Sequence, residues 1–373
     1  MTTDQPIDIM LPADSVEAVS TAAPPRPRRR RWPYVTLFVL TVLVATSFLI
    51  PLPYVLFAPG FARSTEDRIE ITDGPEVPDA NDGDILFLTV TEQRATVAGA
   101  VRAWLDPIID SAPEDEVLPP GGRKEDRILN RLRMDESKFV ASSLALKAVG
   151  YPVVETGTGA FIDRLLPGYP AGEQLRQGEV ITSIDGEPIR TRSELGESLV
   201  GRPVGDSVVV GVRDPAGAQR TVTVELGLNP DDDSRGYLGV VPTTADRDLD
   251  LPFGVTIDNG RVTGPSAGLA FTLGIIDRLT PGSLTGPKPV AVTGTVAPDG
   301  TVGPIGGIVQ KSVAVDRSGA TRFLYPAATG RDELRRVRAV LGDRVELIPV
   351  ATLDEAIAVL APEGLPAAPP LQP

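Results

Sequence analysis

The sequence predicts a mixed α/β domain that is interrupted by a small β-rich module and preceded by one N-terminal transmembrane helix. Three observations support this. Strands and helices alternate over residues 236–360, short strands separated by turns fill residues 153–226, and residues 32–62 carry no charged side chain. At 373 residues the chain is long enough for two ordinary domains plus extensions.

The N-terminal region predicts a single-pass membrane anchor. Residues 34–50 are almost wholly apolar, and with flanking residues such a helix crosses a hydrocarbon core of about 30 Å. Five arginines within residues 26–31 precede this span and acidic residues follow Arg63, so the N-terminus is expected in the cytoplasm and the remainder outside it, at the cell membrane. The alternative, a cleaved signal peptide, lacks a clear small-residue cleavage site.

Beyond the anchor, a buried strand is expected at residues 84–90, followed by helices at 95–105 and 136–149. The predicted segments are a disordered cytoplasmic tail (1–31), the transmembrane anchor (32–55), a linker (56–82), the two parts of the α/β domain (83–150 and 231–361), the inserted module (151–230) and a disordered C-terminal tail (362–373).

Composition excludes several classes of site. The chain has no Cys and no His, so disulfides, thiolate nucleophiles, Ser-His-Asp triads and His-ligated metals are excluded. A net charge of −14 and an aromatic content of 5 % argue against nucleic acid as a partner. We expect no metal and no cofactor. Any base that works near neutral pH must be a carboxylate, a lysine, an amino terminus or a tyrosine.

A candidate nucleophile is Ser266, within the string GPSAG (264–268) that precedes the apolar run 269–276. Pro265 is typical of a first helical position, which places Ser266 in the first turn. There, unpaired N–H groups and the helix dipole favour a developing oxyanion. Taken alone, GPSAG more often simply begins a buried helix with a small-residue packing face.

A candidate base is Lys311, in a helix that begins after Gly307. Lys311 shares the inward stripe of this helix with Ile308 and Val315. Either its ammonium group extends to the helix edge, or burial lowers its pKa and makes it a general base. Together with Ser266 and the absence of histidine, this lysine predicts a Ser-Lys dyad.

Residues 254–360 resemble the proteolytic domain of the Lon protease family. The resemblance is carried by GPSAG, VTGTVAPDGTVGPIGGIVQK, ATRFLYPA and ELIPVATLDEAIAVL. It implies that Ser266 is the nucleophile, that Lys311 is the base and that the Thr293 hydroxyl holds the lysine. It also implies homo-oligomeric rings, with a hexamer expected. Because residues 134–150 also resemble a helix of that domain, the β-rich module is expected to be an insertion in it.

The β-rich module resembles the PDZ domains of exported proteases, through GAFIDRLLPGYPAG and GEVITSIDGEPI. Such domains bind an extended peptide beside an exposed strand and hold its terminal carboxylate with loop N–H groups. Gly157, Thr158 and Gly159 are the expected part of that loop. The alternative is a spacer that binds nothing.

The chain departs from the Lon pattern in two respects. No GxxxxGK[ST] phosphate loop occurs, so the ATPase module is expected to be missing. Thr263, Thr295, Val309 and Gln310 stand where the family commonly has charged residues, which leaves the cleavage specificity open.

The expected function is therefore that of an ATP-independent, membrane-anchored serine endopeptidase. Its expected substrates are unstructured or misfolded extracytoplasmic proteins and peptides, recruited by the PDZ-like module through their C-termini. The alternative is a catalytically silent peptide-binding scaffold or chaperone at the membrane.

Overall fold

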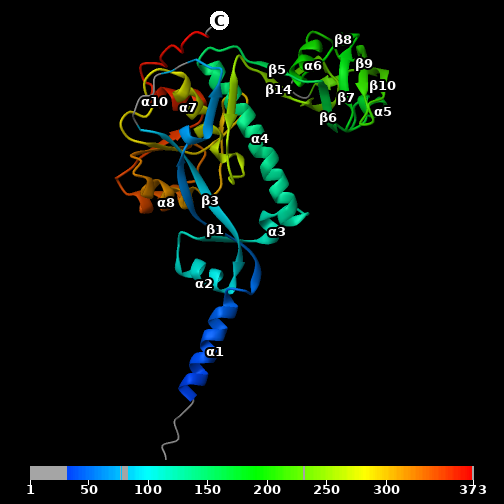
Figure 1. Cartoon of the computed structure of the whole chain (residues 1–373). Helices are drawn as coiled ribbons and strands as arrows, with labels where there is room; N and C mark the ends of the chain where they lie inside the picture. Colours follow the sequence, from blue (N-terminus) through cyan, green and yellow to red (C-terminus); the bar gives the residue numbers. More distant parts are fainter. Residues whose placement is uncertain (1–31, 76, 78–82, 230–231, 372–373) are drawn as a thin grey trace, which may run out of the picture.

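The computed structural model describes residues 32–75, 77, 83–229 and 232–371 (Figure 1). It consists of an α/β domain, a β-rich module that projects from one side, and an N-terminal helix at the opposite end from the C-terminus. The predicted disordered tail 1–31 with its arginines, residues 78–82 of the predicted linker and the last two residues of the C-terminal tail lie outside the described residues.

A six-stranded mixed sheet with the order β20-β19-β16-β3-β1-β4 forms the centre of the α/β domain. Its strands are β1 (Pro51–Ser64), β3 (Ile85–Thr96), β4 (Asp110–Pro113), β16 (Val290–Val292), β19 (Arg322–Pro326) and β20 (Glu346–Val350). β16 runs parallel to both β3 and β19, whereas β1 runs antiparallel to β3 and β4. The expected mixed α/β class is confirmed.

Helices and short ladders complete this domain. The helices are α2 (Val97–Leu105), α3 (Glu114–Val117), α4 (Gly122–Ala148), α7 (Gly268–Leu279), α8 (Ile308–Ser318), α9 (Arg331–Leu341) and α10 (Leu353–Leu360), with 3-10 turns η1 (Glu66–Arg68) and η2 (Pro265–Ala267). The two-stranded ladders join β2 (Ile69–Thr72) to β15 (Gly254–Ile257) and β17 (Thr295–Val296) to β18 (Val302–Gly303).

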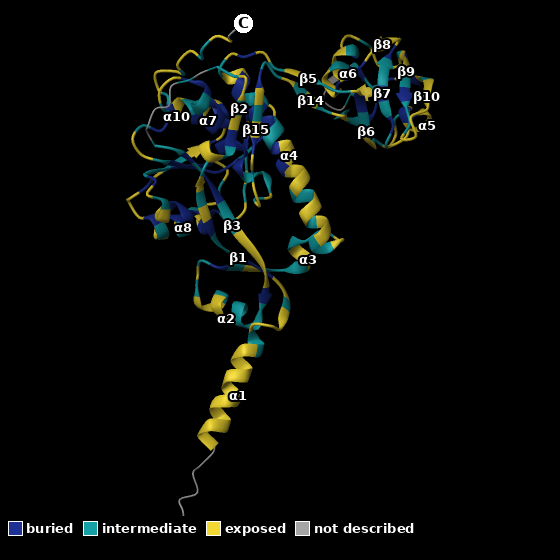
Figure 2. Cartoon of the chain, in the orientation of Figure 1, coloured by how far each residue is buried: buried dark blue, intermediate teal, exposed yellow. Residues whose placement is uncertain are grey.

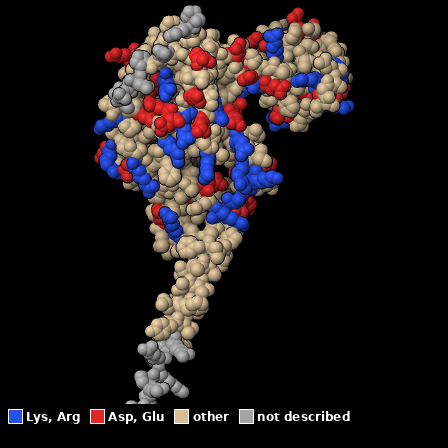
Figure 3. Space-filling model, viewed as in Figure 1, with Lys and Arg blue, Asp and Glu red and all other residues tan. Residues whose placement is uncertain are grey.

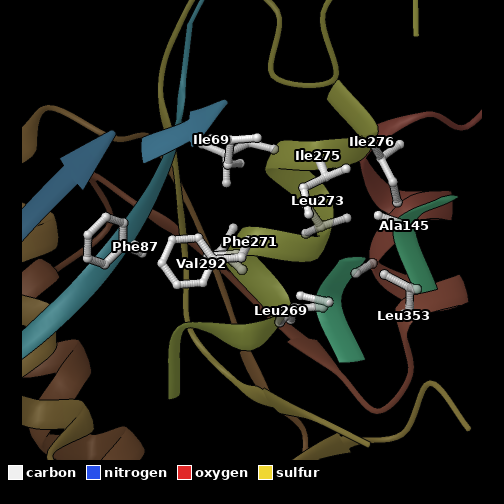
Figure 4. Packing of buried hydrophobic residues seen from close by; sticks show 14 of the residues in the cluster. Ile69, Phe87, Ala145, Leu269, Phe271, Leu273, Ile275, Ile276, Val292 and Leu353 are labelled. Atoms are coloured by element: carbon white, nitrogen blue, oxygen red, sulfur yellow. The ribbon is translucent and has the colours of Figure 1, made fainter. Parts of the chain in front are cut away.

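Alternate side chains of the sheet enter two separate cores, as the period of two of a strand requires. Phe87 and Val292 pack with α7, α4 and α10 on one face, and Phe271 of α7 lies with its ring centroid 5.3 Å from that of Phe87 (Figure 4). Leu88 and Ala291 pack with α8 and α9 on the other face. The sheet is therefore the middle layer of three, and α7 and α8 lie on opposite sides of it.

The β-rich module is a second folding unit with its own apolar core (Figure 2). Its sheet has the order β10-β9-β7-β6-β13, with α5 (Ala171–Gln174) and α6 (Arg192–Ser198) beside it. The strands are β6 (Gly159–Leu165), β7 (Val180–Ile184), β8 (Glu187–Pro188), β9 (Ser207–Arg213), β10 (Gln219–Glu225) and β13 (Val240–Ala245), with a small ladder of β11 (Gly227–Asn229) and β12 (Asp232–Tyr237). The ladder of β5 (Val154–Thr156) and β14 (Asp248–Asp250) connects the module to the α/β domain.

The predicted end of the module at residue 230 differs from the structure. β13 pairs with β6 along its whole length, from Val240 opposite Leu165 to Ala245 opposite Gly159. This pairing joins segments about 80 residues apart, so local turn signals near residue 230 did not reveal it.

The predicted anchor and linker also differ from the structure. A helix, α1 (Trp32–Ser47), forms as expected but ends before Pro51 and Pro53, because proline lacks an amide donor and restricts the residue before it. Residues 51–64, divided in the prediction between anchor and linker, instead form β1, with Val55 and Leu56 buried. Within the described ranges, the structure contains no helix that is long and apolar enough to cross a membrane.

Two further segments differ from expectation. α4 begins at Gly122, whereas the sequence predicted its start at residue 136. The C-terminal tail has no regular secondary structure over 362–371, yet Leu365 and Ala368 pack on the main core and Tyr151 Oη donates a hydrogen bond to the Pro369 carbonyl at 2.6 Å. This part of the tail is therefore packed on the domain and not disordered.

We predict that Phe271→Ala destabilises the α/β domain by about 3–5 kcal/mol, because Phe271 is fully buried against Phe87 and its removal leaves a cavity. Urea unfolding followed by circular dichroism measures the loss. Val209→Ala, at a part-exposed position on β9 of the module, is the matched control and should leave this transition unchanged. A loss below about 1 kcal/mol for Phe271→Ala would contradict the packing described.

Candidate active site

Ser266 lies in the 3-10 turn η2, directly before α7. Gly264 enters this turn with φ 98°, a conformation that residues with a Cβ rarely adopt. The carbonyl of Ser266 accepts a hydrogen bond from Gly294 N–H at 3.0 Å, and the carbonyl of Gly294 accepts one from Leu269 N–H at 3.1 Å. Ser137 Oγ of α4 donates to the carbonyl of Pro265. The serine is therefore held by backbone contacts on both sides.

Lys311 extends from α8 toward Ser266 through the interior of the domain, with only 2 % of its surface exposed. Its Nζ lies 2.9 Å from Ser266 Oγ and 2.9 Å from Thr293 Oγ1. Thr293 directly follows β16 and is fully buried, and its hydroxyl also donates to the Ser266 carbonyl at 3.2 Å. The structure thus brings together all three residues that the sequence predicted for the catalytic site.

Burial changes the acid-base character of the lysine. It lowers the pKa of Lys311 from 10.5 to about 7, because an ammonium group loses its hydration in the interior. A substantial fraction of the amine is therefore neutral near neutral pH. The neutral amine can accept the Ser266 proton with its lone pair while an N–H donates to Thr293.

Backbone donors for an oxyanion lie beside the serine. The N–H groups of Ser266 and Ala267 belong to the first turn of η2, where donors have no partner within the helix, and the first internal bond runs from Gly268 N–H to the Pro265 carbonyl. Donors in this position favour negative charge on an oxygen next to the nucleophile.

A cleft of about 1100 Å³ opens onto the dyad, and Ser266 and Lys311 form part of its wall. Its opposite wall is formed by β1 and β3, including Phe57, Phe61 and Val90. β3 pairs with β16 only over Ile85–Phe87, so within the described chain the edge that follows Phe87 has no strand on that side. The cleft can therefore take an extended peptide as an added strand.

Gln310 is a residue at the cleft whose role the sequence did not reveal. It is fully buried, and its Nε2 donates to the Ile108 carbonyl at 2.7 Å and to Asp110 Oδ2 at 2.8 Å. Arg336 of α9 also pairs with Asp110 at 2.8 Å. These contacts attach α8 to the start of β4 and to the segment before it. The only signal in the sequence was the uncharged side chain directly before Lys311.

In the loop of the β-rich module that was predicted to bind carboxylates, backbone N–H groups already donate hydrogen bonds within the module. Thr158 N–H donates to the Ala245 carbonyl, and Gly159 N–H donates to the Arg190 carbonyl, both at 2.9 Å. A Cβ on Gly157 would lie 2.6 Å from the Arg190 carbonyl oxygen, so this segment packs tightly and is not an open loop. These contacts argue against residues 157–159 as a carboxylate loop.

A different groove in the module suits a peptide. It has a volume of about 240 Å³ and lies between α6 and β13, with an apolar floor of Leu195, Leu199, Leu238 and Val240. β13 is the edge strand of its sheet, so among the described residues its outer edge is free to pair. The turn before it contains Gly239 with φ 76°, which opens the strand toward α6.

Comparison with known proteins identifies part of the chain. Residues 246–362 match the family "Lon protease (S16) C-terminal proteolytic domain". The chain is 34 % identical to Lon protease of Elusimicrobium minutum over 36 % of this chain and 15 % of that protein. It is 32 % identical to Lon protease 2 of Bacillus subtilis over 32 % of this chain and 20 % of that protein. The match to Lon protease of Roseiflexus castenholzii is 28 % over 52 % of this chain and 26 % of that protein.

The chain thus spans about a sixth to a quarter of the length of these curated relatives. The expected resemblance to the Lon proteolytic domain is confirmed for residues 246–362. Among solved structures, the chain is similar to the PDZ domains of the SdrC-like proteins of Listeria monocytogenes (22 % identity, 23 % of this chain, 90 % of that chain, TM-score 0.22) and Listeria innocua (21 %, 22 %, 92 %, 0.21).

We predict that kcat/KM on an unstructured peptide rises with pH through about 7, because burial lowers the pKa of Lys311 to that value and only the neutral amine accepts the Ser266 proton. Well below pH 7 the rate should fall about tenfold for each pH unit. The measurement is a pH profile of peptide cleavage, with Ser266→Ala as the blank. A profile that stays flat through this range would contradict the assignment of the base.

Substitutions of Lys311 and Thr293 distinguish a lysine that acts as a general base from one that is only a structural cation. Lys311→Arg keeps the charge but cannot deprotonate, so we expect it to be as inactive as Ser266→Ala. Thr293→Val should lose less activity, because it removes one hydrogen bond to the amine and keeps the base. Circular dichroism of each variant shows whether it is folded, and a folded, active Lys311→Arg variant would exclude the dyad.

Proposed function

From the premise that residues 246–362 match the Lon proteolytic domain, we propose that this protein is a membrane-anchored serine endopeptidase that works without ATP. Its proposed substrates are unstructured or misfolded proteins outside the cytoplasm. The main support for a peptidase is one observation. The buried Lys311 amine lies 2.9 Å from the Ser266 hydroxyl, and the Thr293 hydroxyl is its second partner.

The geometry supports acyl transfer in two steps. Neutral Lys311 takes the proton of Ser266 as Oγ attacks a peptide carbonyl, and the N–H groups of Ser266 and Ala267 stabilise the oxyanion. The protonated lysine then gives its proton to the leaving amine, which yields the acyl-enzyme. A water molecule, deprotonated by the same lysine, hydrolyses the ester and restores Ser266.

The cleft supports an unstructured substrate. A peptide that adds to the free edge of β3 must be extended, so a folded segment does not enter. Activity without ATP stays a prediction, made from a sequence in which no GxxxxGK[ST] phosphate loop occurs.

The proposed location rests on the N-terminal region. An uncharged segment preceded by clustered arginines supports a cytoplasmic N-terminus and a catalytic domain on the other side of the membrane. The homo-oligomeric ring that the family resemblance implies stays a prediction.

The experiment that tests the enzyme compares the full-length protein with Ser266→Ala on an unstructured protein substrate. We expect internal cleavage products from the native chain alone, and labelling of Ser266 by a serine-directed covalent probe. The alternative, a silent peptide-binding scaffold or chaperone, predicts substrate binding with no cleavage and no labelling. The intact contacts among Ser266, Lys311 and Thr293 favour the enzyme.

We further propose that the β-rich module recruits substrates by a free C-terminus, in the groove between α6 and β13. The apolar floor suits an apolar terminal side chain, and the free edge of β13 offers backbone pairing. Arg192 and Arg235 line the same groove and bring positive charge to it. The spacer alternative predicts that blocking the groove changes nothing.

We predict that Gly196→Trp in the full-length protein raises KM roughly tenfold for substrates that end in a free apolar carboxyl terminus. Gly196 lines the groove, and a side chain there meets open space, so the tryptophan blocks the groove without disturbing the fold. Gly172→Trp on α5 is the matched control, because Gly172 is also open but lies outside the groove. The same rise for C-terminally amidated substrates, or no rise at all, would support the spacer.

A further inference from the structure

We propose that the outer face of α2, formed by Val101, Trp104 and Leu105, is a second lipid-contacting surface that lies in the membrane interface beside α1. This inference rests on the proposed membrane anchoring. It goes beyond that proposal, because it assigns a membrane role to the catalytic domain itself.

In α2 the small side chains face the domain and the large apolar side chains face outward, the reverse of a helix whose outer face lies in water. Its small residues face inward, where Gly99 would place a Cβ 2.9 Å from Leu56 and Ala103 packs on the cluster around Leu56. Its large apolar residues lie one turn apart on the outside, where 84 % of Trp104 is exposed. A continuous apolar face of this kind needs a partner.

The same surface continues onto α1. The Val97 N–H at the start of α2 donates to the Ile50 carbonyl at 3.3 Å, and α2 lies next to the C-terminal end of α1 (Figure 1). None of the 16 residues of α1 is buried. Figure 3 shows no charged side chain along α1 on the visible face, and uncharged surface continues from it onto the base of the domain.

Lipid fits this combined surface better than a second protein chain. α1 carries large apolar side chains around its whole circumference, including Leu37, Phe38, Val39 and Leu40 at four consecutive positions, all exposed. A neighbouring chain covers one side of a helix, whereas a bilayer covers every side. The partner that covers α1 must also meet α2, because the two helices are adjacent.

The dimensions agree with this placement. The 16 residues of α1 span about 24 Å, less than the hydrocarbon core of about 30 Å. An interfacial helix buries its apolar face by about 5–10 Å, which supplies the missing thickness. Exposed Phe48, Leu49 and Ile50 directly follow α1, and Trp104 is the residue type enriched at this depth. The exposed Arg102 on α2 can reach lipid phosphates.

The two tryptophans of the chain allow a direct test in the full-length protein. Trp32→Phe leaves Trp104 as the only tryptophan, and Trp104→Phe leaves Trp32 on α1 as the matched control. Each variant is reconstituted in vesicles of phosphatidylcholine and phosphatidylglycerol, with or without bromine on the acyl chains near the glycerol. We expect brominated chains to quench Trp104 and to leave it protected from aqueous iodide.

Each other result overturns the inference. Quenching of Trp104 by iodide without any effect of bromine would place the outer face of α2 in water. Protection from both quenchers that grows with the protein-to-lipid ratio would show that a second copy covers it. Quenching of Trp32 by brominated lipid tests the anchor separately, and Ser266-dependent peptide cleavage by the same samples tests the enzyme separately.

Discussion

The arrangement of the site depends on the amine of Lys311, which is buried between two hydroxyl groups. Lowering its pKa from 10.5 to about 7 corresponds to a cost on the order of 5 kcal/mol, because the unfolded chain keeps this lysine protonated up to its ordinary pKa. The cost is largest below about pH 7, where the folded lysine is also protonated, and declines as pH rises toward 10.5. Apolar packing elsewhere must offset it.

The three-layer architecture provides that packing and brings the dyad together. Ser266 lies at the start of α7 on one face of the sheet, Lys311 lies in α8 on the other face, and Thr293 lies between them at the carboxyl end of β16. Each helical layer is fixed to the sheet by its own apolar cluster. A shift of either helix would therefore separate the serine from the lysine, so their contact depends on the integrity of both cores.

β1 links the region that follows α1 to the cleft beside Ser266 and Lys311. The strand begins three residues after α1, buries Val55 and Leu56 in the domain, and then contributes Phe57 and Phe61 to the cleft wall. The β-rich module is attached separately, through the ladder of β5 and β14 (Figure 1). The cleft wall is thus directly connected through β1 to the region of α1, whereas the groove between α6 and β13 belongs to a distinct folding unit.

The sequence alone predicted the chemistry that is proposed for the site. Ser266 in a helix-starting GPSAG, Lys311 on an inward stripe and the absence of histidine together predicted a Ser-Lys dyad, and local periodicity predicted the α/β class. Only the tertiary structure decided features that depend on contacts between distant segments. β1 arises from residues that looked like anchor and linker, because its partners β3 and β4 lie 20 to 60 residues further along the chain. The edge strand β13 replaced residues 157–159 as the candidate peptide site for the same reason. The lowered pKa of Lys311 likewise required the structure, since desolvation is a property of everything packed around the amine.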